Sequence, residues 1–376
     1  MNIRQVGLGR TCNDVISKLE VIPGVNRILS HDIISNRVQG RVKQRDSWEP
    51  RHINPGAKAF SPYWREMLSP SIPSSQELDM MFPVYSPSWD TIRNPPKDKI
   101  QCTWIGHSTT LVQMQGTTLL TDPIFSQRCS PSQYFGPKRF RKPACSLREI
   151  QNHGINIDIV LLSHNHYDHL DYASMKELAN PLDDKAPPIF VVPLGLQSWF
   201  QTYISSKIDI VELDWHETIT ISDSINVTSV PMRHWSNRIG IDRDQTLWCG
   251  YAVEGKDANT IPLSTSGIKK TQKFLFPGDT AWFDGLHDIG DQYGPFDLAT
   301  IPIGAYVPWD FMKAYHLDPP HAVLMAQAIR AKKSVPIHFG CFTLTFEPVM
   351  EPLEWLKKIN SGQNFDPWFI GETITD

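Results

Sequence analysis

The sequence has few features of a secreted or membrane-spanning protein. None of its 376 residues belongs to a run approaching the ~18 apolar residues of a transmembrane helix. The first 20 residues lack the apolar core of a secretory signal. There are six cysteines and no Cys-x-x-Cys pair. A chain this long does not need a disulfide framework, so we expect reduced thiols in an intracellular protein whose membrane contact is peripheral.

An excess of positive charge is also missing. The chain has 36 Lys and Arg against 40 Asp and Glu, for a formal net charge of -4. This balance argues against a nucleic-acid binder that relies on overall positive charge, so we expect no nucleic-acid partner. Hydrophobic residues make up 40% and charged residues 20%, which is typical of a globular chain with a buried core.

Residues 1–98 differ from the rest in composition, with polar, Pro-rich and Ser-rich stretches and few regular patterns. They predict an N-terminal extension that wraps the core. A short helix is expected at residues 75–82, with Ser74 or Ser75 as its N-cap. Apolar side chains gather in and before this helix. Two interpretations stay open: the cluster packs on the main domain, or it dips into a membrane. Its members are Trp64, Met67, Leu68, Met80, Met81 and Phe82.

Residues 99–376 are expected to form one catalytic domain. Hairpins come first and helices are interspersed later, which indicates an α/β fold with mixed sheets. Residues 255–271 are polar and predict an exposed loop. Strands are expected at 100–106, 109–115, 117–121, 157–162, 189–192, 211–213, 218–221, 226–231, 250–253, 273–276, 297–302 and 334–337, and helices at 172–179, 194–205 and 319–331.

The strongest chemical signal follows the buried strand at 157–162. Three histidines and an aspartate fall within six residues there. Imidazole and carboxylate suit zinc or another borderline divalent metal. His164 and His166 can point at one metal while Asp168 and His169 turn toward a second. Two metals about 3.5–4 Å apart are a common arrangement for splitting phosphate esters.

Two metals need further ligands, and three more strands end at residues of the right type. His234, Asp279 and His338 each follow a predicted strand. The carboxylate of Asp279 is suited to bridging both ions. Taken together, these residues indicate a two-metal hydrolase.

The motif His-x-His-x-Asp-His, followed by His, Gly-Asp-Thr and His, resembles the metallo-β-lactamase superfamily. Within it, the chain resembles the N-acylphosphatidylethanolamine-hydrolysing phospholipases D, from about residue 54 to about residue 340. Gly-Pro-Lys-Arg-Phe at 136–140 and Ile-Pro-Ile-Gly-Ala-Tyr at 301–306 are the more specific matches. Others lie at 103–108, 120–125, 130–134, 163–171, 193–196 and 296–299.

The resemblance implies an αββα sandwich with two zinc ions per chain. It implies that His164, His166 and His234 hold one zinc, and that Asp168, His169 and His338 hold the other, with Asp279 as the bridge. Asp168, Asp279 and His316 are the expected catalytic residues.

The roles of the surrounding residues are less sharply defined. His316 is expected to bind or protonate the substrate, or instead to cap the helix near Pro319. Asp122 and His107 are expected to support the ligands from behind; alternatively, Asp122 is a turn residue before Pro123. Residues expected to line the substrate groove are Gln133, Tyr134 and Tyr167. Residues expected either to attract anionic lipid or to lie in a solvated loop are Lys138, Arg139 and Arg141.

The implied activity is hydrolysis of N-acylphosphatidylethanolamine to N-acylethanolamine and phosphatidate at a phospholipid surface, by a homodimer. Two alternatives stay open. One keeps the metal site but takes a lactone or a nucleic-acid phosphodiester as substrate. The other is a lipid-binding protein with a vestigial site. One departure from the family pattern is that Gly371-Glu372 lacks the expected preceding Lys-His.

Overall fold

Two β-sheets lie face to face in the computed structural model, which describes residues 72–182, 185–222, 224–255, 271–359 and 364–376. The seven-stranded sheet has the order β13-β1-β2-β3-β4-β5-β6, and the six-stranded sheet has the order β12-β11-β10-β9-β8-β7. The strands of the first are β1 Gln101–Gly106, β2 Thr109–Met114, β3 Thr117–Thr121, β4 Ile159–Leu161, β5 Ile189–Pro193, β6 Ile210–Leu213 and β13 Thr373–Thr375. Those of the second are β7 Thr218–Ile221, β8 Ile225–Val230, β9 Gly250–Gly255, β10 Gln272–Phe276, β11 Leu298–Pro302 and β12 Ser334–Ile337.

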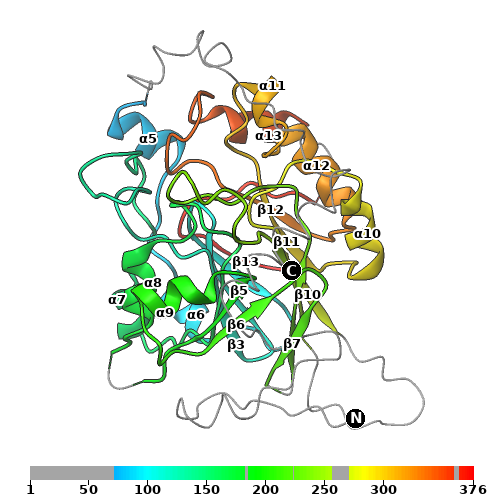
Figure 1. The fold of residues 1–376 in the computed structure, drawn as a ribbon. Helices are drawn as coiled ribbons and strands as arrows, with labels where there is room; N and C mark the ends of the chain where they lie inside the picture. Colours follow the sequence, from blue (N-terminus) through cyan, green and yellow to red (C-terminus); the bar gives the residue numbers. More distant parts are fainter. Residues whose placement is uncertain (1–71, 183–184, 223, 256–270, 360–363) are drawn as a thin grey trace.

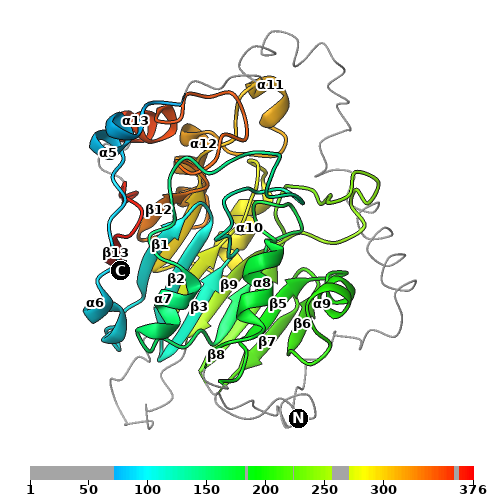
Figure 2. The same cartoon turned by 90° about the vertical axis from the view of Figure 1, so that its left-hand side faces the viewer.

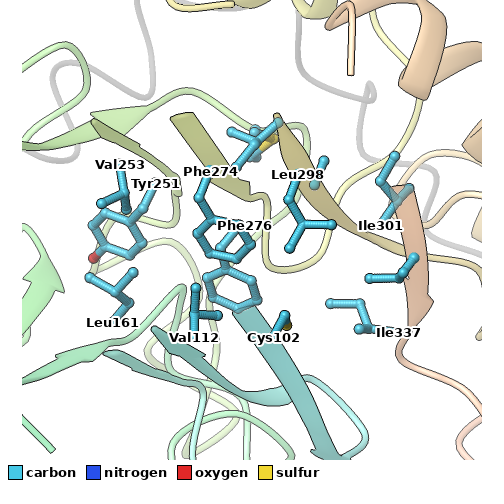
Figure 3. Close-up of a cluster of buried hydrophobic side chains, with 14 of the residues drawn as sticks. Cys102, Val112, Leu161, Tyr251, Val253, Phe274, Phe276, Leu298, Ile301 and Ile337 are labelled. Carbon is cyan, nitrogen blue, oxygen red and sulfur yellow. The ribbon is translucent and has the colours of Figure 1, made fainter. Parts of the chain in front are cut away.

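Alternating side chains along the strands build two cores. In β4, Ile159 and Leu161 face the space between the sheets, while Val160 faces outward toward the helices. This is the period-two pattern of a strand that is buried on both faces. Figure 3 shows the inner core, where Phe274 and Phe276 of the second sheet meet Val112 and other residues of the first.

Helices cover the outer face of each sheet, which gives an αββα sandwich as predicted (Figures 1 and 2). The first sheet is covered by α7 Leu147–Asn152, α8 Tyr172–Leu178 and α9 Gln197–Tyr203. The second is covered by α10 Gly285–Gln292, α12 Pro319–Ala328 and α13 Glu351–Ile359. The remaining helices of the described residues are α5 Ser75–Met81, α6 Trp89–Arg93 and α11 Trp309–Met312.

The predicted strands and helices are confirmed, with boundaries shifted by a few residues. The sequence analysis missed α6, α7, α10, α11, α13 and β13, which have three to nine residues. Helices α6 and α7 have five and six residues, so neither presents a full amphipathic repeat, although Ser88 and Ser146 cap them. Strand β13 has three residues and is half-buried. Most of the predicted polar loop, residues 256–270, lies outside the described residues.

The apolar cluster of the N-terminal segment divides in the structure. Helix α5 begins with a capping box between Ser74 and Glu77. Phe82 is fully buried, whereas Met80 and Met81 are exposed. Neither interpretation therefore fits the whole cluster. Its other members, Trp64, Met67 and Leu68, lie outside the described residues.

Two further expectations concern the cysteines and the membrane. The five cysteines within the described residues are free, and Cys12 lies outside them. Across the described ranges, every helix is too short or too polar to cross a bilayer.

The topology brings several strand ends to one edge of the sandwich. β3 and β4 run parallel, as do β10, β11 and β12. Parallel strands present their carboxyl ends at the same edge, so the residues that follow them lie close together. The segments that meet in this way follow β3, β4, β10 and β12.

Candidate metal centre

Three histidines from two loops form one compact group. Nε2 of His164 lies 2.8 Å from Nδ1 of His166, which lies 3.2 Å from Nε2 of His234. One nitrogen from each ring lies within 4.8 Å of the other two. Ring nitrogens directed into one shared space are suited to a single divalent cation.

A second group surrounds the carboxylate of Asp168. Its Oδ2 lies 3.2 Å from Nε2 of His169 and 3.2 Å from Nε2 of His338. Nε2 of His107 lies 3.0 Å from the same oxygen. His107, expected only to support the ligands, is thus as close to Asp168 as the two expected ligands are, and its ring belongs to the same possible metal group.

Asp279 lies between the two groups. Its Oδ2 is 3.1 Å from Nε2 of His169 and 3.1 Å from Nε2 of His338, and it is 3.8 Å from Nε2 of His234. This carboxylate reaches histidines of both sets. It follows β10 through Gly278, whose φ of +61° favours glycine.

The electrostatics of the centre favour neutral imidazoles at His166 and His234 and ionised carboxylates at Asp168 and Asp279. Burial lowers the pKa of His166 to about 3 and that of His234 to about 4. Although burial acts in the opposite direction, the charge of His169 holds the pKa of Asp168 and Asp279 well below the ordinary value.

Burial also opposes protonation of His338, but Asp279 raises its pKa to about 9. Asp279, Asp168 and Asp122 likewise raise the pKa of His169 against burial. The carboxylates thus favour positive charge at the rings of His169 and His338. The same negative charge would attract a divalent cation.

Unpaired buried atoms at the centre fit a metal ion. Oδ1 of Asp279, Nε2 of His166 and Nδ1 of His316 are buried and have no hydrogen-bond partner among the described residues. Buried polar atoms in proteins are nearly always paired, so a gathering of unpaired polar atoms needs an explanation. Nitrogen and carboxylate oxygen atoms in this arrangement suit zinc or a similar divalent cation.

Supporting contacts fix the candidate ligands from behind. Nδ1 of His234 donates to the backbone carbonyl of Tyr315 at 2.9 Å, which leaves Nε2 free to face the centre. Asp122 is fully buried, and its Oδ2 lies 2.6 Å from Nδ1 of His169. Asp122 therefore does more than form a turn before Pro123.

The sequence analysis did not single out Arg238, which braces the loop that carries four candidate ligands. Its Nη1 donates to the carbonyls of Asn165 and Leu170 at 3.0 and 2.9 Å. Its guanidinium lies over the rings of Tyr167, at 4.0 Å, and Trp199, at 5.0 Å. No sequence pattern marks this residue, because its partners are backbone carbonyls and aromatic faces distant in sequence.

The expected substrate residues divide into two sets. His316 lies at the centre, with Nδ1 3.8 Å from Oδ2 of Asp279. It does not cap α12, because Asp318 is the N-cap residue there. Tyr167 lies within the ligand loop, residues 163–171, and packs against Arg238.

Gln133 and Tyr134 lie elsewhere, in an exposed loop. The side chain of Gln133 hydrogen-bonds the backbone of Arg128, and Tyr134 is 85% exposed. In the described residues, no hydrogen bond or ring contact joins either residue to the ligand cluster.

Two of the three cations that were expected on the surface are buried. Arg139 is 5% exposed and lies over the ring of Phe342, and Arg141 is 6% exposed and pairs with Asp79 of α5 at 2.7 Å. Both expectations, attraction of anionic lipid and a solvated loop, are wrong for these arginines. Arg139 instead holds its loop against Phe342, Arg141 ties it to α5, and only Lys138 of the three is exposed.

The stacked sheets and the centre at their shared edge define a metal-dependent hydrolase of the metallo-β-lactamase type. The model of the Beta-lactamase superfamily domain matches residues 117–339. A possible metal-dependent hydrolase from Veillonella parvula has a similar fold, with a TM-score of 0.56 and 15% identity over 74% of this chain and 100% of that one. A metallo hydrolase from Ignicoccus hospitalis gives a TM-score of 0.52 and 19% identity, covering 74% and 98%. These likenesses show the fold.

Sequence relatives narrow the family. N-acyl-phosphatidylethanolamine-hydrolyzing phospholipase D 1 of Caenorhabditis elegans is 34% identical over 305 residues, which are 78% of this chain and 79% of that protein. The mitochondrial enzyme of the same name from Saccharomyces cerevisiae is 26% identical over 347 residues, covering 89% and 69%. The chain belongs to the family of N-acylphosphatidylethanolamine-hydrolysing phospholipases D, within the metallo-β-lactamase superfamily.

Proposed function

We propose that the protein is a two-zinc phosphodiesterase that hydrolyses N-acylphosphatidylethanolamine to N-acylethanolamine and phosphatidate. The observation that carries this proposal is the position of Asp279. Its Oδ2 lies within 3.8 Å of histidine nitrogens from both candidate metal groups. A carboxylate shared in this way is what a pair of adjacent cations requires.

The proposed roles follow from these positions. His164, His166 and His234 would hold one ion; Asp168, His169 and His338 the other; and Asp279 both. Divalent ions bound there would lower the pKa of water toward neutrality and offset charge on the phosphoryl oxygens.

The protein's own residues then orient the substrate. His316 borders Asp279 and has an unpaired Nδ1, so we assign it to hydrogen-bonding the phosphodiester. Water attacks phosphorus, and the bond from phosphorus to the ethanolamine oxygen breaks. The water gives up one proton and the leaving oxygen takes one, so water is the sole co-reactant.

The substrate lies in a bilayer, and the surface beside the centre suits a bilayer. We define the rim loops as residues 126–142 and 235–246. Their exposed apolar side chains are Tyr134 at 85%, Phe135 at 78%, Ile239 at 67% and Ile241 at 83%. Such side chains insert into the boundary between headgroups and acyl chains.

Hydrogen bonds at the bases of both rim loops tie them to the ligand loop. Oγ of Ser126 donates to Asp171 at 2.8 Å, and the backbone N–H of Asn237 donates to Asn165 at 2.8 Å. Figure 2 shows both loops at the same end of the sandwich as α11. We therefore propose that the rim loops contact the phospholipid surface while the centre acts on one lipid. The homodimer implied by the family stays a prediction that sedimentation can test.

The decisive experiment compares substrates and variants. Wild-type protein and Asp168→Ala are incubated with a mixed N-acylphosphatidylethanolamine pool, a lactone and RNA, and the products are identified by mass spectrometry. We expect N-acylethanolamine and phosphatidate from the wild type alone. Unchanged turnover in a folded Asp168→Ala variant would refute the site. Cleavage of the lactone or RNA in place of the lipid would refute the substrate.

A further inference from the structure

One hydroxyl group joins the two candidate metal groups behind the centre. Asp122 accepts hydrogen bonds from the backbone N–H of Ser163 at 2.7 Å and from its Oγ at 2.5 Å. The same carboxylate lies 2.6 Å from Nδ1 of His169. Oγ of Ser163 also lies 2.8 Å from Nδ1 of His164. Asp122 thus reaches a histidine of one group directly and a histidine of the other through Ser163.

The direction of each hydrogen bond follows from the donors available. Oγ of Ser163 donates its single hydrogen to Oδ2 of Asp122. The oxygen of Ser163 is then left to accept from Nδ1–H of His164. A proton on Nδ1 leaves Nε2 of His164 with its lone pair, and this is the nitrogen that faces His166. Nδ1 of His169 makes its hydrogen bond to Asp122 directly.

We propose that Ser163 is a positioning residue that extends the orienting effect of Asp122 from one metal position to the other. This inference rests on the proposed two-metal site. Removing the hydroxyl leaves His169 oriented and releases only His164. The two metal positions should therefore respond unequally to the loss of Oγ.

The backbone of Ser163 is held independently of its side chain. Its N–H donates to Asp122, and its carbonyl accepts from the N–H of Cys249 at 3.0 Å. Gly278 lies against it so closely that a Cβ there would be 2.3 Å from Cβ of Ser163. Ser163→Ala therefore removes one oxygen without releasing the chain.

The test measures zinc directly. Metal-free wild type, Ser163→Ala and Ser108→Ala are titrated with Zn²⁺ in competition with a chromophoric chelator, and bound zinc is counted by mass spectrometry. Ser108 is a matched control, because its buried Oγ has no hydrogen-bond partner among the described residues. Wild type and Ser108→Ala should bind two equivalents alike. Ser163→Ala should bind one equivalent about 10–100-fold more weakly and the other unchanged.

Asp122→Asn gives the comparison with the complete support removed, and both equivalents should weaken. Nitrogen-15 spectra of the histidine rings supply a second readout. The Nδ1–H signal of His164 should be lost or shifted in Ser163→Ala, while that of His169 stays. Ser163→Cys, which keeps the volume but donates poorly, should show the same pattern if the alanine variant folds badly.

The outcomes separate this inference from the proposed function. Two wild-type-like equivalents in Ser163→Ala, or equal weakening of both, would overturn the role of Ser163 and leave the two-metal enzyme standing. Fewer than two equivalents in the wild type would refute the two-metal site, and this inference with it.

Discussion

The ligand cluster and the rim loops share one end of the sandwich but are built in opposite ways. In the cluster, His169 and His234 are buried, and each is held by a hydrogen bond from its Nδ1 to Asp122 or to the carbonyl of Tyr315. In the rim loops, Phe135 and Ile241 are exposed, and the hydrogen bonds from Ser126 and Asn237 to the ligand loop lie at the loop bases. Metal chemistry needs fixed geometry, whereas surface contact needs accessible apolar groups. Changes in the cluster or its supporting contacts should therefore affect every substrate, and changes at the exposed apolar side chains of the rim only bilayer substrates.

The largest effect is expected in the middle of the cluster. Asp279→Ala removes the carboxylate that reaches both histidine groups. The loss of several kcal/mol of charge stabilisation corresponds to a fall in kcat of at least about 10³-fold. The fall should be equal on a dispersed short-chain substrate and on vesicles. Circular dichroism checks the fold, and a fall confined to vesicles would erase the distinction between cluster and rim.

A smaller effect is expected from substituting Arg238, which supports the ligand loop from behind. Arg238→Ala leaves the carbonyls of Asn165 and Leu170 without their donor. Loosening the ligand loop should lower metal affinity about 10–100-fold, as the loss of outer supporting contacts does. Arg238→Lys should recover only part of it, because an ammonium cannot reproduce the planar fork. Chelator competition measures the affinity, and full recovery by lysine would contradict this account.

The rim should show a selective effect. In Tyr134→Ser/Phe135→Ser, two exposed rings are lost, and each buries apolar area only when a bilayer is present. Co-sedimentation with phospholipid vesicles should fall about tenfold, since a fraction of the ~1.5–3 kcal/mol for full burial of a side chain is at stake. Turnover of a dispersed short-chain substrate should stay at the wild-type value. A loss there would place the loop in the chemistry.

The smallest effect is expected at Met80 in α5. Met80→Ser should change the free energy of unfolding by no more than about 0.5 kcal/mol, because the side chain is exposed. Phe82→Ala, two residues away, should cost about 3–5 kcal/mol, because the ring is fully buried. Urea denaturation measures both. Equal values would show that the apolar cluster acts as one unit.

Much of this architecture was predictable because hydrophobic period and ligand chemistry are local. The continuous apolar run at residues 159–162 marks a doubly buried strand, and the next residues carry a ligand pattern that is recognisable within six positions. His234 and His338 were predictable from their places after strands. Arg238 and Ser163 were not, because their importance depends on atoms that only the tertiary fold brings close.

The substrate residues show the same limit. A motif match places Gln133 in a segment shared with the family. It does not show whether the loop that carries Gln133 points toward the metal centre or away from it. The structure uses the Gln133 amide to close its own turn on Arg128. The burial of Arg139 and Arg141 could likewise not be predicted from the sequence. A basic run in a loop predicts solvent exposure unless the contacts of its side chains are known.

The ring of Phe82 has a consequence for where the chain can be shortened. It packs 5.4 Å from the ring of Phe339, and a Cβ on Gly340 would lie 2.4 Å from it. Both residues follow His338 directly. A truncated protein starting at Lys99 would lose the Phe82 ring, and a cavity would remain under the turn that presents His338. The change in composition near residue 98 is therefore a poor site for truncation, because the preceding segment packs under the turn that presents His338.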